Sequence, residues 1–443
     1  MKRFLNQIWI VIGAFVAAIV VSWVIYMPNG DERGVWRAQT GGTIITLTPF
    51  TAKMYSETSV SCLHQLSFPA HLKLVEMAEG ATVSVIDSQL HLNVDGSLDP
   101  MILERIDALP DNCSAANPDA TPRDVFDSMW TAMDEHYAFF DLHGVDWDAR
   151  RALAPAMGDT MTDSALLALL SDTLQGLDDG HVQIGAPIGY VSPAQDPDWL
   201  VDTLNRDALT QIARDTLGTD LTPVDLTGIE YVLLPDGVGY VLIRHMGLDT
   251  PFGTTSETAM ALAFSQVADV MTDANSMIID LRYNPGGSDS VSFGVASHFI
   301  DAPLDVFTKT TRDGSENGSG QSAPFTAVLQ PFDATPLTQP VIVLTSQLTG
   351  SAAEILIMTM RELAQVITMG QPTSGGLSDI LGFKLANGWD LGLSHQTYRA
   401  MDGQSFEGVG IPPDIPFAIT AAPLLAGEDP LLRAAFVRAR SAN

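Results

Sequence analysis

Basic side chains are scarce in this chain: 22 lysines and arginines stand against 53 aspartates and glutamates, which gives its 443 residues a formal net charge of −31. A surface with this balance repels polyphosphate, so nucleic acid is not an expected partner. It also argues against docking on anionic lipid through a basic patch. Because 46% of the residues are hydrophobic and only 17% are charged, the composition favours a globular protein over a disordered one.

Cysteine is rarer still, because the chain has only Cys62 and Cys113. Neither belongs to a CxxC pair, so thiol redox chemistry and a zinc site have no support. The sequence also shows no metal-ligand cluster, no P-loop and no dinucleotide fingerprint, and we expect no metal and no cofactor. The two cysteines fit an exported compartment in which they form one disulfide, and two unpaired buried thiols are the alternative.

One long apolar run stands near the N-terminus, where residues 8–27 read IWIVIGAFVAAIVVSWVIYM. About 20 such residues, at 1.5 Å each, span the roughly 30 Å hydrocarbon core of a membrane. Two basic residues precede the run and two acidic residues follow it, so we expect a transmembrane signal-anchor over residues 1–28 with the rest outside, on the periplasmic face of the inner membrane. Cleavage as a signal peptide, followed by secretion, is the alternative, although no clear small-x-small cleavage site follows.

Behind this run the periodicity changes along the chain. Residues 29–118 predict a small β-rich unit of unknown role, the N-terminal β unit, because stretches such as GTIITLTPF and ATVSVIDSQLHLNV alternate apolar and polar residues. Residues 119–195 predict a helical subdomain. Thr121 and Pro122 are typical of a helix N-cap and first turn, and SALLALLSDTLQGL predicts a second helix.

From residue 196 to residue 425, short apolar strands alternate with helices. The predicted strands are IEYVLL, VGYVLIRHM, SMIIDLRY and PVIVLTS, and the predicted helices are ETAMALAFSQVADVMT and SAAEILIMTMRELAQ. Such alternation is typical of an α/β fold. Residues 426–443 remain as a C-terminal tail.

The most informative segment is VIVLTSQLTGSAAEILIM, in which a buried strand leads through a turn into a helix with Ser351 at the junction. Unpaired backbone N–H groups at a helix start can stabilise an oxyanion, so a hydroxyl at this point suits acyl transfer. The residues from Ser351 to Glu354 also spell a capping box, which requires no catalysis. This motif alone leaves both interpretations open.

Two other segments carry residue types that such chemistry needs. In DLRYNPGG a strand runs into the turn 284–287, where paired glycines can aim N–H groups at a ligand, although an ordinary turn is the alternative. In LDDGHV, His181 follows a tight turn, where a histidine is usually a surface or packing residue. Eight other histidines compete for the role of general base.

Together, LDDGHV, DLRYNPGG, TGSAAEI and GQPTSGG, in this order, resemble the tail-specific (C-terminal processing) and tricorn-type serine peptidases. The segment MWTAMDEHYAFFDLHGVDWDA is similar to the N-terminal helical region of that family, so the resemblance covers roughly residues 123–417. It implies a ClpP/crotonase-like α/β peptidase core. It also implies a serine peptidase that cleaves peptide or protein substrates through an acyl-enzyme.

The resemblance further implies roles for single residues. Ser351 falls at the nucleophile of the family. The N–H groups of Ala352 and Gly286, with Gly287 close behind, fall at the oxyanion hole. In the tail-specific branch a lysine base follows the serine, but Gly376 stands at that position here, so a Ser-Lys dyad is not expected.

The tricorn-like branch uses a histidine as base, and His181 falls at its position. Glu407, in EGVGIPPD, falls at the carboxylate that orients this histidine, and Glu354 or Asp280 are the alternatives. Such a carboxylate fixes the imidazole tautomer and stabilises the imidazolium formed during attack. Tricorn has a serine directly before its histidine, where this chain has Gly180, so no fourth polar member of the site is carried over.

Many tail-specific proteases carry a PDZ domain between the histidine and the core. Only about 45 residues separate Ile184 from Gly228, fewer than a whole domain usually needs, so we expect none here. Two other functions suit the same fold. One is a non-catalytic carrier of apolar ligands, as in the interphotoreceptor retinoid-binding protein, and the other is a serine esterase or amidase. The GxSxG elbow of α/β-hydrolases is absent from the sequence.

Overall fold

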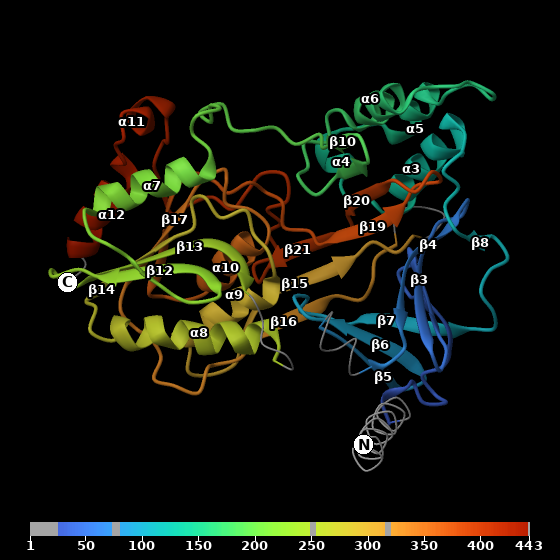
Figure 1. The fold of residues 1–443 in the computed structure, drawn as a ribbon. Helices are drawn as coiled ribbons and strands as arrows, with labels where there is room; N and C mark the ends of the chain where they lie inside the picture. Colours follow the sequence, from blue (N-terminus) through green and yellow to red (C-terminus); the bar gives the residue numbers. More distant parts are fainter. Residues whose placement is uncertain (1–24, 73–79, 249–253, 315–319, 442–443) are drawn as a thin grey trace, which may run out of the picture.

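The computed structural model describes residues 25–72, 80–248, 254–314 and 320–441. The expected signal-anchor, residues 1–28, lies almost wholly outside these ranges. Within them, no helix combines the length and the apolar character that crossing a membrane requires. Figure 1 shows two lobes: the α/β core forms one, and the N-terminal β unit with the helical subdomain forms the other.

The N-terminal β unit contains an eight-stranded sheet with the spatial order β5-β6-β7-β1-β2-β3-β4-β8. Its strands are β1 (Gly34–Ala38), β2 (Thr43–Leu47), β3 (Thr51–Glu57), β4 (Cys62–Pro69), β5 (Ala81–Ile86), β6 (Gln89–Val94), β7 (Met101–Ile106) and β8 (Cys113–Ser114). The alternation read from the sequence buries one face, around Trp36 and Leu90. A disulfide joins Cys62 to Cys113, where β4 and β8 pair in parallel.

The helical subdomain begins as its sequence predicts. Thr121 caps α3, and its hydroxyl accepts a hydrogen bond from the Asp124 N–H, with Pro122 in the first turn. The helices are α3 (Pro122–His136), α4 (Phe140–His143), α5 (Trp147–Arg150) and α6 (Asp163–Leu174). They pack on a four-stranded sheet of order β10-β9-β20-β19, formed by β9 (Gln183–Ala186), β10 (Gly189–Val191), β19 (Ile380–Lys384) and β20 (Asp390–Ser394).

The core is a seven-stranded sheet of order β11-β12-β13-β14-β17-β18-β22, parallel from β13 to β22. Its strands are β11 (Thr222–Pro223), β12 (Thr227–Leu233), β13 (Val238–Leu248), β14 (Ser276–Asp280), β17 (Val341–Thr345), β18 (Val366–Gly370) and β22 (Ile415–Pro416). The expected α/β fold is confirmed. Strands buried on both faces explain why these segments read as nearly unbroken apolar runs.

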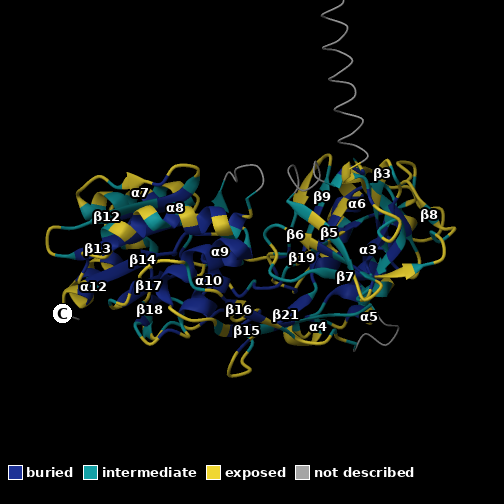
Figure 2. Cartoon of the chain, turned by 90° about the horizontal axis from the view of Figure 1, so that it is seen from below, coloured by how far each residue is buried: buried dark blue, intermediate teal, exposed yellow. Residues whose placement is uncertain are grey.

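Helices cover both faces of this sheet. One face packs against α8 (Ser256–Met271), α9 (Asp289–Ala296) and α10 (Ala352–Met360), and the other against α7 (Arg206–Leu217) and α12 (Pro430–Ser441). Residues 426–443, expected as a tail, therefore contain a packed helix, with Leu432 and Phe436 buried on the second face. Every residue of α9 and α10 is buried (Figure 2).

A small sheet of order β16-β15-β21 lies between the two lobes in Figure 1. It is formed by β15 (Leu304–Thr311), β16 (Phe325–Leu329) and β21 (Gln396–Ala400), and the short helix α11 (Ala421–Leu425) precedes α12. The loops that follow β14 and β17 carry the turn 284–287 and Ser351. Both loops therefore leave the carboxyl edge of the parallel sheet, where α/β proteins usually place their ligand sites.

Candidate active site

Ser351 lies between β17 and α10, at the N-cap of the helix. Its backbone has φ +54° and ψ −129°, a combination that residues other than glycine rarely adopt. The capping box is present, because the Ser351 N–H donates to the Glu354 carboxylate at 3.0 Å. Other N-caps of this chain have φ between −67° and −73°, namely Thr121, Thr162, Asn205 and Thr255.

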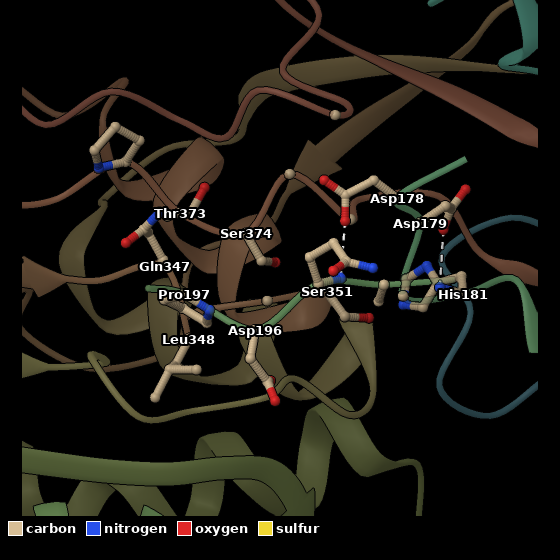
Figure 3. A pocket seen from close by; sticks show the side chains of 18 of the residues that line it. Asp178, Asp179, His181, Asp196, Pro197, Gln347, Leu348, Ser351, Thr373 and Ser374 are labelled. Carbon is tan, nitrogen blue, oxygen red and sulfur yellow. Dashed lines mark hydrogen bonds between the residues drawn. The ribbon is translucent and has the colours of Figure 1, made fainter. Parts of the chain in front are cut away.

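These ordinary caps show that capping needs no positive φ. A residue held in a sparsely populated region costs about 1–3 kcal/mol, and such residues cluster at functional sites. Capping alone therefore does not account for the backbone of Ser351, whose side chain lines a pocket (Figure 3).

Glu354 is fully buried and holds the loop 373–376 under Ser351. Besides the Ser351 N–H, its carboxylate accepts hydrogen bonds from the Thr373 hydroxyl at 2.5 Å and the Gly375 and Gly376 N–H groups at 2.8 and 3.0 Å. Burial raises the pKa of Glu354, and these donors oppose the rise. With its oxygens occupied in this way, Glu354 fastens the loop and is a poor candidate for orienting a histidine.

The glycine turn contacts Ser351 directly. Gly286 has φ +107°, and a Cβ built on it would lie 2.5 Å from the Ser351 Cβ, so only glycine fits. Its N–H donates to the Asn284 side chain at 2.8 Å, within the turn. Among the described residues, no acceptor is recorded for the N–H groups of Gly287 and Ala352. The N–H of Gly286, which the family resemblance put first among the expected oxyanion donors, thus donates to Asn284, whereas those of Gly287 and Ala352 have no such partner within the described ranges.

His181 is positioned by a buried aspartate. Its backbone N–H donates to Asp179 Oδ1 at 2.8 Å (Figure 3), and Ser394 and Tyr137 donate to the same carboxylate at 3.1 and 3.0 Å. Burial and the nearby Asp179 raise the pKa of Tyr137, so its hydroxyl stays a donor. Asp179 thereby joins the end of α3, the end of β20 and the backbone of His181.

His181 also lies close to Ser351 through Gly376. The Gly376 carbonyl accepts the Ser351 N–H at 3.1 Å, and a Cβ built on Gly376 would lie 3.9 Å from His181 Cε1. The residue at the position of the family's lysine thus sits between the serine and the histidine. A Cβ on Gly180 would meet nothing within 4 Å, so this position has room for the serine that tricorn carries.

Glu407 is buried beside the same pocket. Its Oε2 accepts the N–H groups of Leu377 and Ser378, both at 3.1 Å. Burial raises the pKa of Glu407 well above its usual range, and the neighbouring carboxylates of Asp179 and Glu354 raise it further. Glu407 Oε1 and His181 Nδ1 are both buried and have no hydrogen-bond partner among the described residues.

The other alternative carboxylate, Asp280, lies outside this pocket. It forms a buried ion pair with Arg282 at 2.7 Å, and Arg282 also pairs with Asp429 at 2.7 Å. Tyr240 donates to Asp280 at 2.8 Å. These partners occupy Asp280 in the core, so it does not compete with Glu407, which lines the pocket together with His181.

The pocket has a volume of about 620 Å³ and is lined by Ser351, His181 and Glu407 together. Asp178, Asp196 and Asp198 also line it, with Arg206. Arg206 donates to the carbonyl oxygens of Tyr283 and Leu348 at 2.6 and 2.8 Å, which ties the loops after β14 and β17 together. No group of three or more metal-ligand side chains is present in the part of the chain that the structure describes.

The N-terminal β unit contacts the α/β core near the glycine turn. The Gly96 carbonyl accepts the Ser290 N–H at 3.2 Å, in the first turn of α9. Asp99 pairs with the buried Lys309 at 2.5 Å. The sequence predicted no role for this unit, and it contains no local motif that would predict either contact.

Comparison with known proteins identifies the two regions. Residues 237–417 match peptidase family S41, and residues 118–174 match the tricorn protease C1 domain. Ser351, Glu407 and the turn 284–287 fall inside the S41 region, whereas His181 falls between the two matches. The predicted resemblance to the tail-specific and tricorn-type peptidases is confirmed.

Individual relatives are distant. A carboxyl-terminal-processing protease of Picosynechococcus sp. is 28% identical over 178 residues, which are 40% of this chain and 38% of that protein. The carboxy-terminal processing protease CtpA of Bacillus subtilis is 26% identical over 32% of this chain and 28% of its own length. This chain therefore spans about a third of the length of these relatives.

Similarity to a solved structure extends over more of the chain than these two sequence matches do. A protein from Parabacteroides merdae, described as a candidate peptidase, is 29% identical with a TM-score of 0.60. The match covers 72% of this chain and 97% of that one. It supports the same mixed α/β fold over most of both molecules.

Proposed function

We propose that this chain, which carries a peptidase family S41 region behind a tricorn C1 region, is a serine-type endopeptidase with Ser351 as its nucleophile. His181 is the general base and Glu407 orients it. The finer fold assignment, a ClpP/crotonase-like core, belongs to the same proposal. The supporting observation is the positive φ of Ser351 in a pocket shared with His181 and Glu407.

The residues would act in two steps. The Ser351 Oγ attacks the peptide carbonyl carbon while His181 takes the hydroxyl proton, and the oxyanion accepts hydrogen bonds from the Ala352 and Gly287 N–H groups. The amine leaves with the proton that His181 returns. Water then attacks the acyl carbon while His181 takes a proton from it. The bond between this carbon and Ser351 Oγ breaks, His181 returns the proton to Oγ, and the carboxylic acid product leaves.

Glu407 and His181 must pair during this cycle. In the structure Glu407 Oε1 and His181 Nδ1 are both unpaired, and catalytic hydrogen bonds of this kind often tighten only when substrate is bound. An ionised Glu407 accepts from the Nδ1–H and leaves Nε2 free to take a proton, whereas a protonated Glu407 does not. Because burial raises the pKa of Glu407, we expect the active form to appear as the pH rises.

Peptide hydrolysis by wild-type protein and by Ser351→Ala tests the proposal. Loss of a serine nucleophile should lower kcat by about 10⁴- to 10⁶-fold. Ser374→Ala is the matched control, since Ser374 lines the same pocket but its hydroxyl donates to Glu354 at 3.1 Å. Equal rates for wild type and Ser351→Ala would refute the assignment. Turnover of short acyl esters without cleavage of peptides would instead indicate an esterase.

The proposal also includes an external location. The apolar run of residues 8–27 suits an anchor, and the disulfide between Cys62 and Cys113 suits an oxidising compartment. We therefore propose a single-pass membrane protein with its site outside the cytoplasm. Carbonate extraction of membranes, combined with thiol labelling before and after reduction, checks both points. A soluble protein with two reactive thiols would contradict them.

A further inference from the structure

We propose that the open face of the sheet β10-β9-β20-β19 is a second binding groove, which holds an extended, uncharged segment of the polypeptide substrate away from the scissile bond. The inference rests on the proposed peptidase function and adds to it a subsite for long substrates. We call this surface the sheet groove. Its cavity has a volume of about 490 Å³, and Gln183, Gly185, Tyr190, Ile380, Gly382 and Leu66 are among its lining residues.

The sheet is covered on one face only in the part of the chain that the structure describes. Ile184, Leu391 and Leu393 point into the hydrophobic cluster shared with α3 and α6. Because side chains alternate along a strand, their neighbours Gln183 and Gly392 point to the opposite face, into the groove. The edge strand β19 lies beside β3 and β4 of the N-terminal β unit (Figure 1), which borders the groove.

One glycine, Gly382, leaves part of the groove floor open. The side chains of Gln183 and Ile380 instead cover Gly392, where a Cβ would lie 2.9 Å from Gln183 and 3.0 Å from Ile380. Gly185, Gly382 and Gly392 come from three neighbouring strands and all line the cavity. A Cβ on Gly382 would meet nothing within 4 Å, so the space above it is open. Glycine inside a strand often marks a place where another backbone approaches closely. A floor of this kind suits an extended polypeptide lying across the strands.

The walls of the groove are apolar and exposed. Tyr190 is 60% exposed, Ile380 is 46% exposed and Leu66 is 36% exposed, although all three border a concave surface. Apolar side chains gathered around a concavity favour an apolar occupant. The charged side chains in the lining, Lys384 and Asp390, pair with each other at 2.6 Å and leave no net charge for a ligand. The occupant is therefore uncharged along the segment that enters.

Two chain segments lead directly from the catalytic pocket to the groove. His181 lines the pocket and Gln183, two residues later, lines the groove. Gly376, whose carbonyl accepts the Ser351 N–H, also lines the pocket, and Ile380 lines the groove. Extended chain spans at most about 3.6 Å per residue, so roughly 14 Å separates Gly376 from Ile380 at most. A substrate needs only about four to six further residues to enter the groove.

The experiment compares short and long substrates with variants of the groove. Gly382→Phe fills the open space without backbone strain, because Gly382 has no positive φ, and Tyr190→Ala removes one wall. Leu262→Ala is the control, since Leu262 is 55% exposed on α8 and lies outside the groove. The substrates are a short acyl ester and a 12-residue peptide with apolar residues distal to the scissile bond.

We expect Gly382→Phe and Tyr190→Ala to lower kcat/KM for the long peptide about tenfold, mainly through KM, while the ester is unaffected. Leu262→Ala should match wild type on both substrates. Equal losses on ester and peptide, or no loss on either, would overturn the inference. A folding defect would lower kcat/KM for both substrates, so a loss confined to the long peptide indicates a binding effect.

Direct binding separates this inference from the proposed function. Fluorescence anisotropy of the labelled 12-residue peptide is measured with the inactive Ser351→Ala protein, with and without Gly382→Phe. Binding that weakens about tenfold on adding Gly382→Phe supports the groove even if wild-type protein hydrolyses nothing, in which case only the peptidase assignment fails. Unchanged binding refutes the groove even if Ser351 proves to be the nucleophile.

Discussion

Replacing Ser351 by glycine should make the protein more stable while removing its activity. Ser351 has φ +54° and ψ −129°, a conformation that glycine adopts without steric cost. The strain at such a residue is about 1–3 kcal/mol. Glycine in turn lowers the free energy of unfolding by about 0.5–1 kcal/mol, because it makes the unfolded chain more flexible. The difference predicts that Ser351→Gly raises the free energy of unfolding by up to about 2.5 kcal/mol.

Two comparisons isolate the strain from the loss of the hydroxyl. Ser351→Ala removes the hydroxyl but keeps the Cβ and the strain, so it should gain no such stability. Thr121→Gly changes an ordinary cap with φ −68°, whose hydroxyl accepts the Asp124 N–H at 3.2 Å, and should lose a few tenths of a kcal/mol. Urea unfolding followed by tryptophan fluorescence measures all three variants, with unchanged m-values as the condition for comparison.

The opposite sign would refute the reasoning. If Ser351 were only a helix cap, Ser351→Gly would be less stable than wild type, as Thr121→Gly is expected to be. A stability gain together with complete loss of hydrolysis would show that the backbone strain is kept for function.

Three further perturbations follow from the structure. Burial raises the pKa of Glu407 in the folded protein above its unfolded value of about 4.5. The free energy of unfolding should therefore fall as the pH rises through the pKa of the folded state. Urea titrations at several pH values should show a smaller fall for Glu407→Gln than for wild type. The same variant should abolish the increase of kcat/KM with pH that an ionised Glu407 provides, and an unchanged profile would exclude it as the orienting carboxylate. Gly286→Ala should lower kcat at least about 100-fold and destabilise by about 1–3 kcal/mol, since its Cβ would lie 2.5 Å from the Ser351 Cβ; wild-type activity in this variant would contradict the close packing. Asp99→Asn weakens the pair with buried Lys309, so it should lower the free energy of unfolding in urea by about 1–3 kcal/mol. It should also make the N-terminal β unit more sensitive to limited proteolysis. Asp99→Glu keeps the charge and should retain more of the stability and of the protease resistance.

Local patterns in the sequence predicted much of the core. The strand predicted at VGYVLIRHM is β13, the strand in SMIIDLRY is β14, and the helix starting after Thr121 has the predicted cap. These elements depend on residues close together in the chain, such as an apolar run, a cap or a paired glycine turn. The family resemblance then placed Ser351 and His181, which line one pocket.

Other features depend on contacts between residues far apart in the sequence, and periodicity in the sequence does not predict such contacts. Asp179 accepts hydrogen bonds from Tyr137, 42 residues earlier, and from Ser394, 215 residues later. The contact between Gly96 and Ser290 similarly joins two distant segments. Such pairs become visible only when the fold brings them together. The glycine turn 284–287 shows the same limit, because only the hydrogen bond to the Asn284 side chain reveals that the Gly286 N–H is occupied.

Labelling with a fluorophosphonate probe, followed by mass spectrometry of the modified peptide, tests the central claim most directly. An activated Ser351 should carry the adduct, and the adduct should disappear in His181→Ala, because the base no longer takes the hydroxyl proton. An adduct on another serine, or labelling of Ser351 that is equally fast in His181→Ala, would contradict the proposed site.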